Sequence, residues 1–256
     1  MFISTHQAHL FTTAFGSPSA PAVLGIGGWI GNWELWLQPF ARLSARWRTI
    51  AYDHRGSGVT VAPIETITFE QLVEDVFAVM DGYGVERAVL AAESAGALTA
   101  LGAALKQPHR VAGLVLVDGF YFGGAPEDSD AFLAGLRTNY SATLEAFVQA
   151  CVPEPNCELI KQWGRQLLKR ATPEAAIALY RMANALDLRP ELHRITQPTL
   201  ILHGSADRLV PLSTAEALAK TLPNAQLRVL AGAGHVPSLT RPQEVAQLMD
   251  EFLGTI

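Results

Sequence analysis

Short apolar runs alternate with longer amphipathic segments in the first half of the chain. Across Phe69–Met80, apolar residues recur at spacings of three and four, which predicts a helix. A second helix is predicted over Ala95–Leu105, ending before Pro108. Strands are predicted before, between and after these helices, at Ala22–Leu24, Arg48–Tyr52, Ala88–Ala92 and Val111–Val117. Because uniformly apolar strands must be covered on both faces, the pattern predicts an α/β fold with a mostly parallel sheet and helices on both faces.

The alternation stops after Asp118, and residues 119–190 have a mostly helical pattern. Predicted strands and helices then alternate again to the end of the chain, over Thr199–His203, Thr214–Leu222, Gln226–Leu230 and Pro242–Phe252. We therefore expect an α/β core of residues 1–118 and 191–256, with a helical cap inserted at residues 119–190.

Composition narrows the class of protein. The chain has 256 residues, of which 49% are hydrophobic and 17% charged, and this excludes an intrinsically disordered chain. A net charge of −5 gives no sign of a nucleic-acid partner. The N-terminus has no signal-peptide pattern, and the apolar stretch Ala88–Leu105 carries Glu93 and Ser94 at its middle, which disfavours a membrane span. We expect a cytoplasmic protein that acts on a small molecule, and nothing in the sequence indicates its oligomeric state.

The cysteines and histidines give no metal-binding pattern. Cys151 and Cys157 are too few for a disulfide framework or a four-ligand zinc site, and no histidine pair has helical ligand spacing. The two cysteines flank a proline-rich turn and are close enough in sequence to pair, but a cytoplasmic location favours free thiols. We therefore predict no metal.

A serine between a predicted strand and a predicted helix is the first candidate for chemistry. In Ala92-Glu93-Ser94-Ala95-Gly96, small residues lie two before and two after the serine. This spacing permits a sharp, strained turn that exposes the hydroxyl at the carboxyl end of the strand. The same pattern also fits a tight turn whose serine only caps the helix, so the motif needs supporting context.

Two further polar residues follow predicted strands and supply that context. Asp207 comes shortly after Thr199–His203, and His235 comes in a glycine-rich loop after Gln226–Leu230. Since the carboxyl ends of parallel strands meet at one edge, Ser94, Asp207 and His235 can converge there. A serine needs an adjacent base, and that base needs an orienting acid, so this order predicts a catalytic triad. Taken singly, Asp207 could be a loop cap and His235 a structural histidine.

Asp118 is the alternative acid, because it also ends a predicted strand. Asp53 and Arg55 are interpreted as residues that fix a loop, and the histidines other than His235 are interpreted as structural. Neither a dinucleotide-binding glycine pattern nor a phosphate-binding loop is present.

An anionic intermediate would also need hydrogen-bond donors. The run Gly27–Asn32 follows the first core strand, and its glycines allow backbone N–H groups to approach a substrate oxygen. We assign this oxyanion hole to the backbone N–H groups of Trp29 and Ala95.

Bulky residues of the cap are expected to shape an apolar pocket, although helical spacing makes most of them packing residues. The pocket candidates are Gly28, Ile30, Phe120, Tyr121, Trp163 and Val236. Other bulky cap residues are Phe122, Phe132, Leu133, Leu136, Tyr180 and Met182.

Taken together, these segments resemble the α/β-hydrolase superfamily over nearly the whole chain. The resemblance rests on the serine turn, on the Asp207 and His235 segments, and on Gly27–Trp29 and Asp53–Gly58. It implies a mostly parallel sheet of eight strands, with a helical cap between the sixth and seventh. It also implies hydrolysis of esters, lactones, amides or thioesters without a cofactor.

Three positions depart from the family pattern. Ala92 replaces the first glycine of the serine motif, and Gly27 replaces a histidine beside the oxyanion loop. Glu93 precedes the serine where a neutral residue or histidine is commoner. A partly buried Glu93 must find a donor or raise its pKa, and we hypothesise that it tunes the serine turn through a nearby donor.

The sequence thus predicts a serine hydrolase that cleaves a small hydrophobic carboxylic ester or lactone through an acyl-enzyme on Ser94. The alternatives are a carbon–carbon bond hydrolase or perhydrolase of the same fold, and a small-molecule receptor that keeps the triad without turnover.

Overall fold

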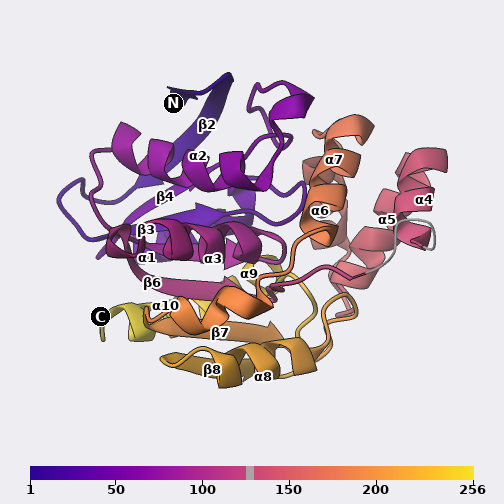
Figure 1. Cartoon of the computed structure of the whole chain (residues 1–256). Coiled ribbons are helices and arrows are strands. Elements are labelled where there is room, and N and C mark those ends of the chain that lie inside the picture. Colours follow the sequence, from indigo (N-terminus) through magenta and orange to yellow (C-terminus); the bar gives the residue numbers. More distant parts are fainter. Residues whose placement is uncertain (125–129) are drawn as a thin grey trace.

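A single eight-stranded sheet organises the chain in the computed structural model, which describes residues 1–124 and 130–256 (Figure 1). Its strands lie in the order β1-β2-β4-β3-β5-β6-β7-β8. Their bounds are β1 Phe2–Thr5, β2 Ala8–Phe15, β3 Ala22–Ile26, β4 Arg48–Tyr52, β5 Ala88–Glu93, β6 Val111–Val117, β7 Thr199–Gly204 and β8 Ala225–Leu230. All pairings from β4 to β8 are parallel, and β1 and β2 add an antiparallel edge. The predicted mostly parallel α/β sheet is confirmed.

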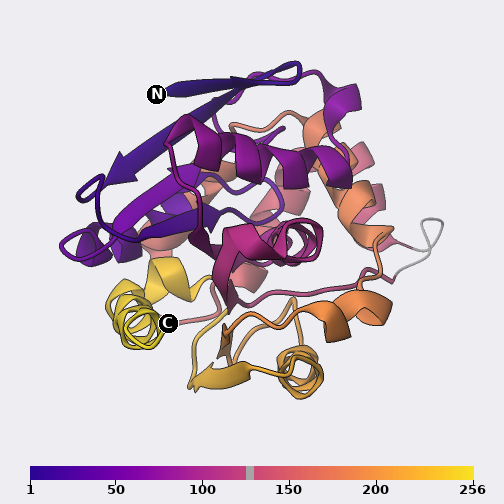
Figure 2. The same ribbon diagram turned by 60° about the vertical axis from the view of Figure 1, so that its left-hand side comes forward.

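Helices cover both faces of the sheet, as uniformly buried strands require. On one face, α2 (Phe69–Gly82), α3 (Gly96–Lys106) and α8 (Leu212–Thr221) pack on apolar side chains of the central strands. On the other, α1 (Leu37–Leu43), α9 (Pro237–Thr240) and α10 (Pro242–Leu253) do the same. Figure 2 shows α8 and the yellow α10 on opposite sides of the sheet. In the described part of the chain, no helix has both the length and the apolar character that crossing a membrane requires.

Among the described residues, four α-helices lie between β6 and β7, at the carboxyl ends of the central strands (Figure 1). They are α4 (Ala131–Thr138), α5 (Tyr140–Cys151), α6 (Glu158–Leu168) and α7 (Pro173–Asn184). Their apolar faces share a cluster with Trp29 and Ile30, which belong to the loop after β3. They fall in the expected helical insertion, whose limits at residues 119 and 190 stay a prediction.

The N-terminal hairpin of β1 and β2 was not predicted from the hydrophobic pattern. Along β2, the residues facing the core are Ala8, Leu10 and Thr12, so the buried face includes a polar side chain. The Thr12 hydroxyl is satisfied there by the Tyr83 hydroxyl at 2.9 Å. A buried threonine weakens the apolar alternation that identifies a strand.

A buried ion pair fixes the loop that follows β4. The Arg55 guanidinium donates to both carboxylate oxygens of Asp75, at 2.7 and 2.9 Å, and neither side chain is exposed to solvent. It also donates to the Thr66 hydroxyl at 2.8 Å. Nearby, Asp53 accepts from the backbone N–H groups of Trp33 and Val59. Asp53 and Arg55 therefore hold the loop, as expected.

Replacing Asp75 should destabilise the fold strongly, because Asp75→Asn leaves a buried guanidinium without its counter-charge. We expect the free energy of unfolding to fall by about 3–5 kcal/mol in urea titrations at neutral pH. The matched control is Glu74→Gln on the same helix, which breaks a half-exposed pair with Lys106 and should change stability by less than about 1 kcal/mol. Equal effects of the two substitutions would contradict this account.

Candidate active site

Ser94 occupies a strained turn between β5 and α3. Its backbone φ is 52°, in the left-handed region that non-glycine residues rarely adopt. The turn is possible because two backbones approach closely: a Cβ on Gly96 would lie 2.5 Å from the Gly27 carbonyl oxygen. A Cβ on Gly28 would lie 3.0 Å from the Ser94 Cβ. The expected strained serine turn is confirmed, and Ala92 fits it with its methyl group in the core.

Three distant side chains meet at this edge of the sheet. The His235 Nε2 lies 2.8 Å from the Ser94 hydroxyl, and the His235 Nδ1 lies 2.7 Å from Asp207 Oδ2. A carboxylate can only accept, so Nδ1 carries the proton and donates to Asp207. The Nε2 lone pair is then free to accept the hydroxyl proton of Ser94. The structure thus brings together the serine, histidine and aspartate that the sequence paired.

The surroundings set opposite pKa shifts on the acid and the base. Burial opposes ionisation of Asp207, but donors from His235, Leu209 and Val210 outweigh it and hold the pKa of Asp207 below its ordinary value. Burial likewise disfavours the charged form of His235, and the Asp207 carboxylate outweighs it and raises the His235 pKa. A stabilised imidazolium beside a permanent carboxylate suits a general base.

Asp118 lies close to the Ser94–His235–Asp207 triad but makes no hydrogen bond to any of its three side chains. Its Oδ1 accepts from the Gly204 N–H at 2.8 Å, and burial raises the pKa of Asp118 well above its ordinary value. The Nε2 of His203 lies 3.0 Å from the Val210 carbonyl oxygen, to which only an N–H can bond, so the bare Nδ1 of His203 faces Asp118 at 3.4 Å. The carboxylate that orients His235 is therefore that of Asp207.

Asp118, His203 and Asp207 are also the described residues whose side-chain atoms lie close enough together to hold a metal ion, within 4.8 Å of one another. Asp207 is already engaged by His235 and two backbone donors. Asp207 follows His203 by four residues, whereas Asp118 reaches His203 only because the ends of β6 and β7 lie side by side. We therefore assign Asp118, His203 and Asp207 a role in holding the acid and the base of the triad in place, rather than in binding a metal.

The insertion holds the loop that carries His235. The Cys151 carbonyl accepts from the His235 N–H at 2.8 Å, and Glu154 Oε1 accepts from the Gly234 N–H at 2.8 Å. The same Glu154 oxygen accepts from the Thr240 hydroxyl at 2.9 Å. We call Cys151 and Glu154 the histidine-loop tether. The sequence did not predict it, and Cys151 and Cys157 are free thiols, as expected.

The two expected oxyanion donors have no protein acceptor. Among the described residues, neither the Trp29 nor the Ala95 backbone N–H makes a hydrogen bond. Their loop is shaped instead through the Gly28 carbonyl, which accepts from Gly31 N at 2.9 Å and lies 3.1 Å from His54 Nε2. Two unpaired N–H groups next to a nucleophile can serve an anion.

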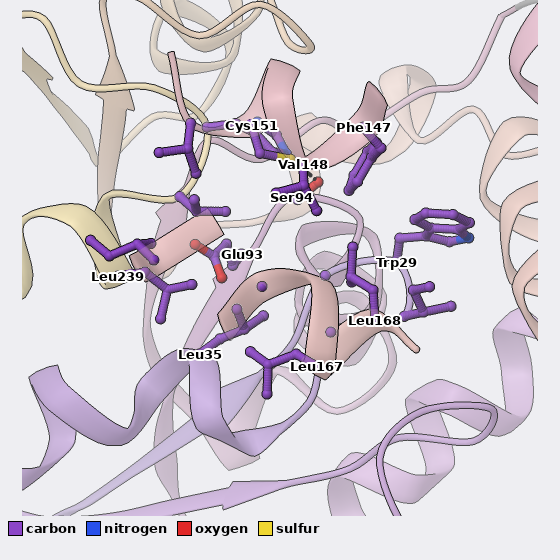
Figure 3. Close-up of a pocket in the computed structure, with 18 residues that line it drawn as sticks. Trp29, Leu35, Glu93, Ser94, Phe147, Val148, Cys151, Leu167, Leu168 and Leu239 are labelled. Atoms are coloured by element: carbon purple, nitrogen blue, oxygen red, sulfur yellow. Dashed lines mark hydrogen bonds between the residues drawn. The ribbon is translucent and has the colours of Figure 1, made fainter. Parts of the chain in front are cut away.

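Two cavities meet at Ser94 and His235, which line both. The outer cavity, of about 470 Å³, lies under the insertion helices and includes the Ala95 position. Its aromatic wall is formed by Trp29, Phe120, Phe122, Phe132, Phe147 and Tyr180. The inner cavity is smaller, about 70 Å³, and runs between α5, α6 and α9 (Figure 3). A carbonyl at Ser94 can therefore direct its two substituents into separate spaces.

Most expected pocket residues line one of these cavities. Phe120 lines the outer one, and the inner one is lined by Gly28, Ile30 and Val236. Tyr121 and Trp163 line neither of these two cavities. Tyr121 is buried in the hydrophobic core, and the Trp163 indole N–H donates to Glu34 at 3.0 Å. Helix α5 was missed as a source of lining residues: Phe147, Val148 and Cys151 share one helical face, a signal that its spacing contained.

Glu93 is the single carboxyl group on the inner cavity, as far as the described residues show (Figure 3). The Ser238 hydroxyl donates to its Oε1 at 2.6 Å, whereas its Oε2 has no partner. Burial raises the pKa of Glu93 to about 7, against the opposing effects of Ser238 and His235. The sequence expectation of a donor or a raised pKa is met by both.

Comparison with known proteins places this site in a family. A model of the alpha/beta hydrolase fold matches residues 21–242. The chain belongs to the alpha/beta hydrolase fold family. A Caulobacter vibrioides protein named as a carbamate hydrolase, RutD, is 29% identical over 250 residues, 93% of each chain.

Solved structures of hydrolases are also similar over nearly the whole chain. A hydrolase from Pseudomonas aeruginosa PA01 has a TM-score of 0.92 at 25% identity, covering 99% of this chain and 98% of its own. A thermophilic esterase from Thermogutta terrifontis has a TM-score of 0.90 at 26% identity, covering 100% and 98%. The expected family, fold and hydrolytic class are confirmed at this level.

The raised pKa of Glu93 should make stability depend on pH. Between about pH 4.5 and 7, the folded protein keeps a proton that the unfolded chain releases, so the contribution of Glu93 to the free energy of unfolding falls as the pH rises. Glu93→Gln has no such proton. In urea titrations, we expect the free energy of unfolding of Glu93→Gln, taken relative to that of the wild type, to rise by roughly 3 kcal/mol between pH 4 and pH 8. A gap that stays constant over this range would contradict the shift.

Proposed function

We propose that the protein is a cofactor-independent serine hydrolase that cleaves a small hydrophobic carboxylic ester or lactone through an acyl-enzyme on Ser94. The observation that carries this proposal is the continuous pair of hydrogen bonds from Ser94 to His235 to Asp207, at 2.8 and 2.7 Å. A serine in this setting loses its proton as it attacks, which a lone hydroxyl cannot do at neutral pH.

In the first half of the reaction, the Ser94 oxygen bonds to the substrate carbonyl carbon while its proton passes to His235 Nε2. The carbonyl oxygen becomes an anion, and the backbone N–H groups of Trp29 and Ala95 stabilise it. The imidazolium, paired with Asp207, then gives its proton to the leaving alkoxide as the carbon–oxygen bond breaks. The alcohol departs and the acyl group remains on Ser94.

In the second half, a water molecule gives a proton to His235 and its oxygen attacks the acyl carbon. The same donors hold the new anion, and the proton returns to the Ser94 oxygen as the acid leaves. No step requires a group beyond the polypeptide, the substrate and water.

The two cavities suggest that the acyl group and the leaving group of the substrate bind in separate spaces. The inner cavity, at about 70 Å³, suits a short acyl group, and the outer cavity, at about 470 Å³, suits the leaving group. Aromatic side chains on the outer wall favour an apolar leaving group. The similarity to the Thermogutta esterase and to the protein named RutD supports ester and carbamate substrates as the first to test.

Removing the nucleophile should abolish turnover. On p-nitrophenyl esters of graded chain length, we expect Ser94→Ala to lower kcat by at least about 10³-fold while the fold is retained. A fluorophosphonate should label the wild type at Ser94 and leave the variant unlabelled, as intact-mass spectrometry would report. Wild-type turnover by Ser94→Ala would eliminate the proposal. Labelling without turnover of esters or lactones would favour the receptor or the carbon–carbon hydrolase.

Substitutions of the two candidate acids, Asp207 and Asp118, should differ sharply in their effect on kcat. Asp207→Asn removes the acceptor of the His235 Nδ1 proton, and we expect kcat to fall by about 10³- to 10⁴-fold. Asp118→Asn is nearly isosteric with the protonated acid and does not touch His235, so its activity should stay within about tenfold of the wild type. The same ester assay compares them, and a larger loss in Asp118→Asn would reassign the orienting acid.

A further inference from the structure

Among the described residues that line the inner cavity, one buried side-chain oxygen, Glu93 Oε2, has no hydrogen-bond partner. Glu93 is 1% exposed, and its Oε1 is used by Ser238, but its Oε2 has no hydrogen-bond partner. Buried polar atoms without partners are rare, because the lost hydration must be replaced. The other walls of the cavity are mainly aliphatic, from Leu35, Val148, Ile160, Leu167, Leu168 and Leu239. A ligand with a polar group that hydrogen-bonds to Glu93 Oε2 would remove this cost.

The strand geometry directs this carboxyl group into the inner cavity. Glu93 is the last residue of β5, and alternate residues of the strand, Val89 and Ala91, pack against the face covered by α1, α9 and α10. Glu93 therefore points to that same face, next to the nucleophile in sequence (Figure 3). A group attached to a carbonyl at Ser94 enters this cavity only a few bonds from the carboxyl.

We propose that Glu93 Oε2 binds a hydroxyl group on the acyl part of the substrate, so that the enzyme selects short hydroxyacyl groups over alkyl acyl groups of the same size. This inference rests on the proposed function, since the acyl group reaches the cavity only when its carbonyl is at Ser94. It makes Glu93 a specificity-determining residue.

A hydroxyl group fits this place better than a charged donor. Glu93 Oε2 is a single unpaired acceptor, the Ser94 and His235 side chains are engaged with each other, and the remaining side chains are mainly apolar, so an ammonium group would be left with unpaired donors. A hydroxyl both donates and accepts, so it satisfies Oε2 whether Glu93 is ionised or protonated. Burial raises the pKa of Glu93 to about 7, so both forms are present at neutral pH and both would bind the hydroxyl.

The test is a pair of isosteric esters, p-nitrophenyl 3-hydroxybutyrate and p-nitrophenyl 3-methylbutyrate, which differ by a hydroxyl in place of a methyl group. We expect the wild type to favour the hydroxy ester by at least about tenfold in kcat/KM. Glu93→Leu should reverse the preference, and Glu93→Gln, which keeps a donor and an acceptor, should retain part of it. The control Glu244→Leu, on the exposed face of α10, should leave the ratio unchanged.

Failure of this inference can be told apart from failure of the proposed function. Fluorophosphonate labelling of each variant reports a folded, reactive Ser94 independently of the acyl group. A wild type that is labelled but favours the methyl ester, or shows no preference, would overturn the role of Glu93, and so would an unchanged ratio in Glu93→Leu. A wild type that is neither labelled nor active on either ester would remove the hydrolase assignment and this inference with it. The wild-type ratio decides the matter even if Glu93→Leu does not fold.

Discussion

The close approach of two backbones beneath the nucleophile is the constraint on which the site depends. Gly96 lies against the Gly27 carbonyl with no room for a side chain, and this contact lets the chain pass from β5 through Ser94 into α3 within two residues. The same contact brings the glycine loop after β3 beside the serine. This one contact between Gly27 and Gly96 therefore positions the nucleophile, the free N–H groups of Trp29 and Ala95, and the beginning of α3. A methyl group at position 96 would disturb all of them together.

Three buried carboxyl groups lie near the imidazole, and their partners decide what each does. Asp207 receives three donors and stays ionised, so it can hold a cation beside it. Asp118 receives one backbone donor, and burial favours its neutral form. Glu93 has one hydroxyl donor and lies between these two cases. The residue type is nearly the same at all three positions, so the local supply of hydrogen bonds, rather than the chemistry of the side chain, separates their behaviour.

Sequence reasoning was most successful where a local pattern reflects a local cause. Alternating apolar segments predicted the parallel sheet, and strand-end positions predicted which side chains converge on Ser94. It was less successful where a role arises only after folding. Trp163 is bulky and lies in the insertion, yet its indole N–H donates to Glu34, far away in sequence, and Trp163 lines neither of the two cavities. Asp118 lies beside His203, and Glu154 accepts from the loop that carries His235, through contacts between residues far apart in the sequence.

The histidine-loop tether has a mechanical consequence. Both of its acceptors belong to the end of α5 and the connection that follows it, and α5 also lines the two cavities. Any motion that widens the route to the serine by lifting this segment would pull on the loop that holds the imidazole. Access and reactivity are thus linked by the same few hydrogen bonds. The imidazole is therefore held in its reactive position only while α5 and the connection after it stay in contact with the His235 loop.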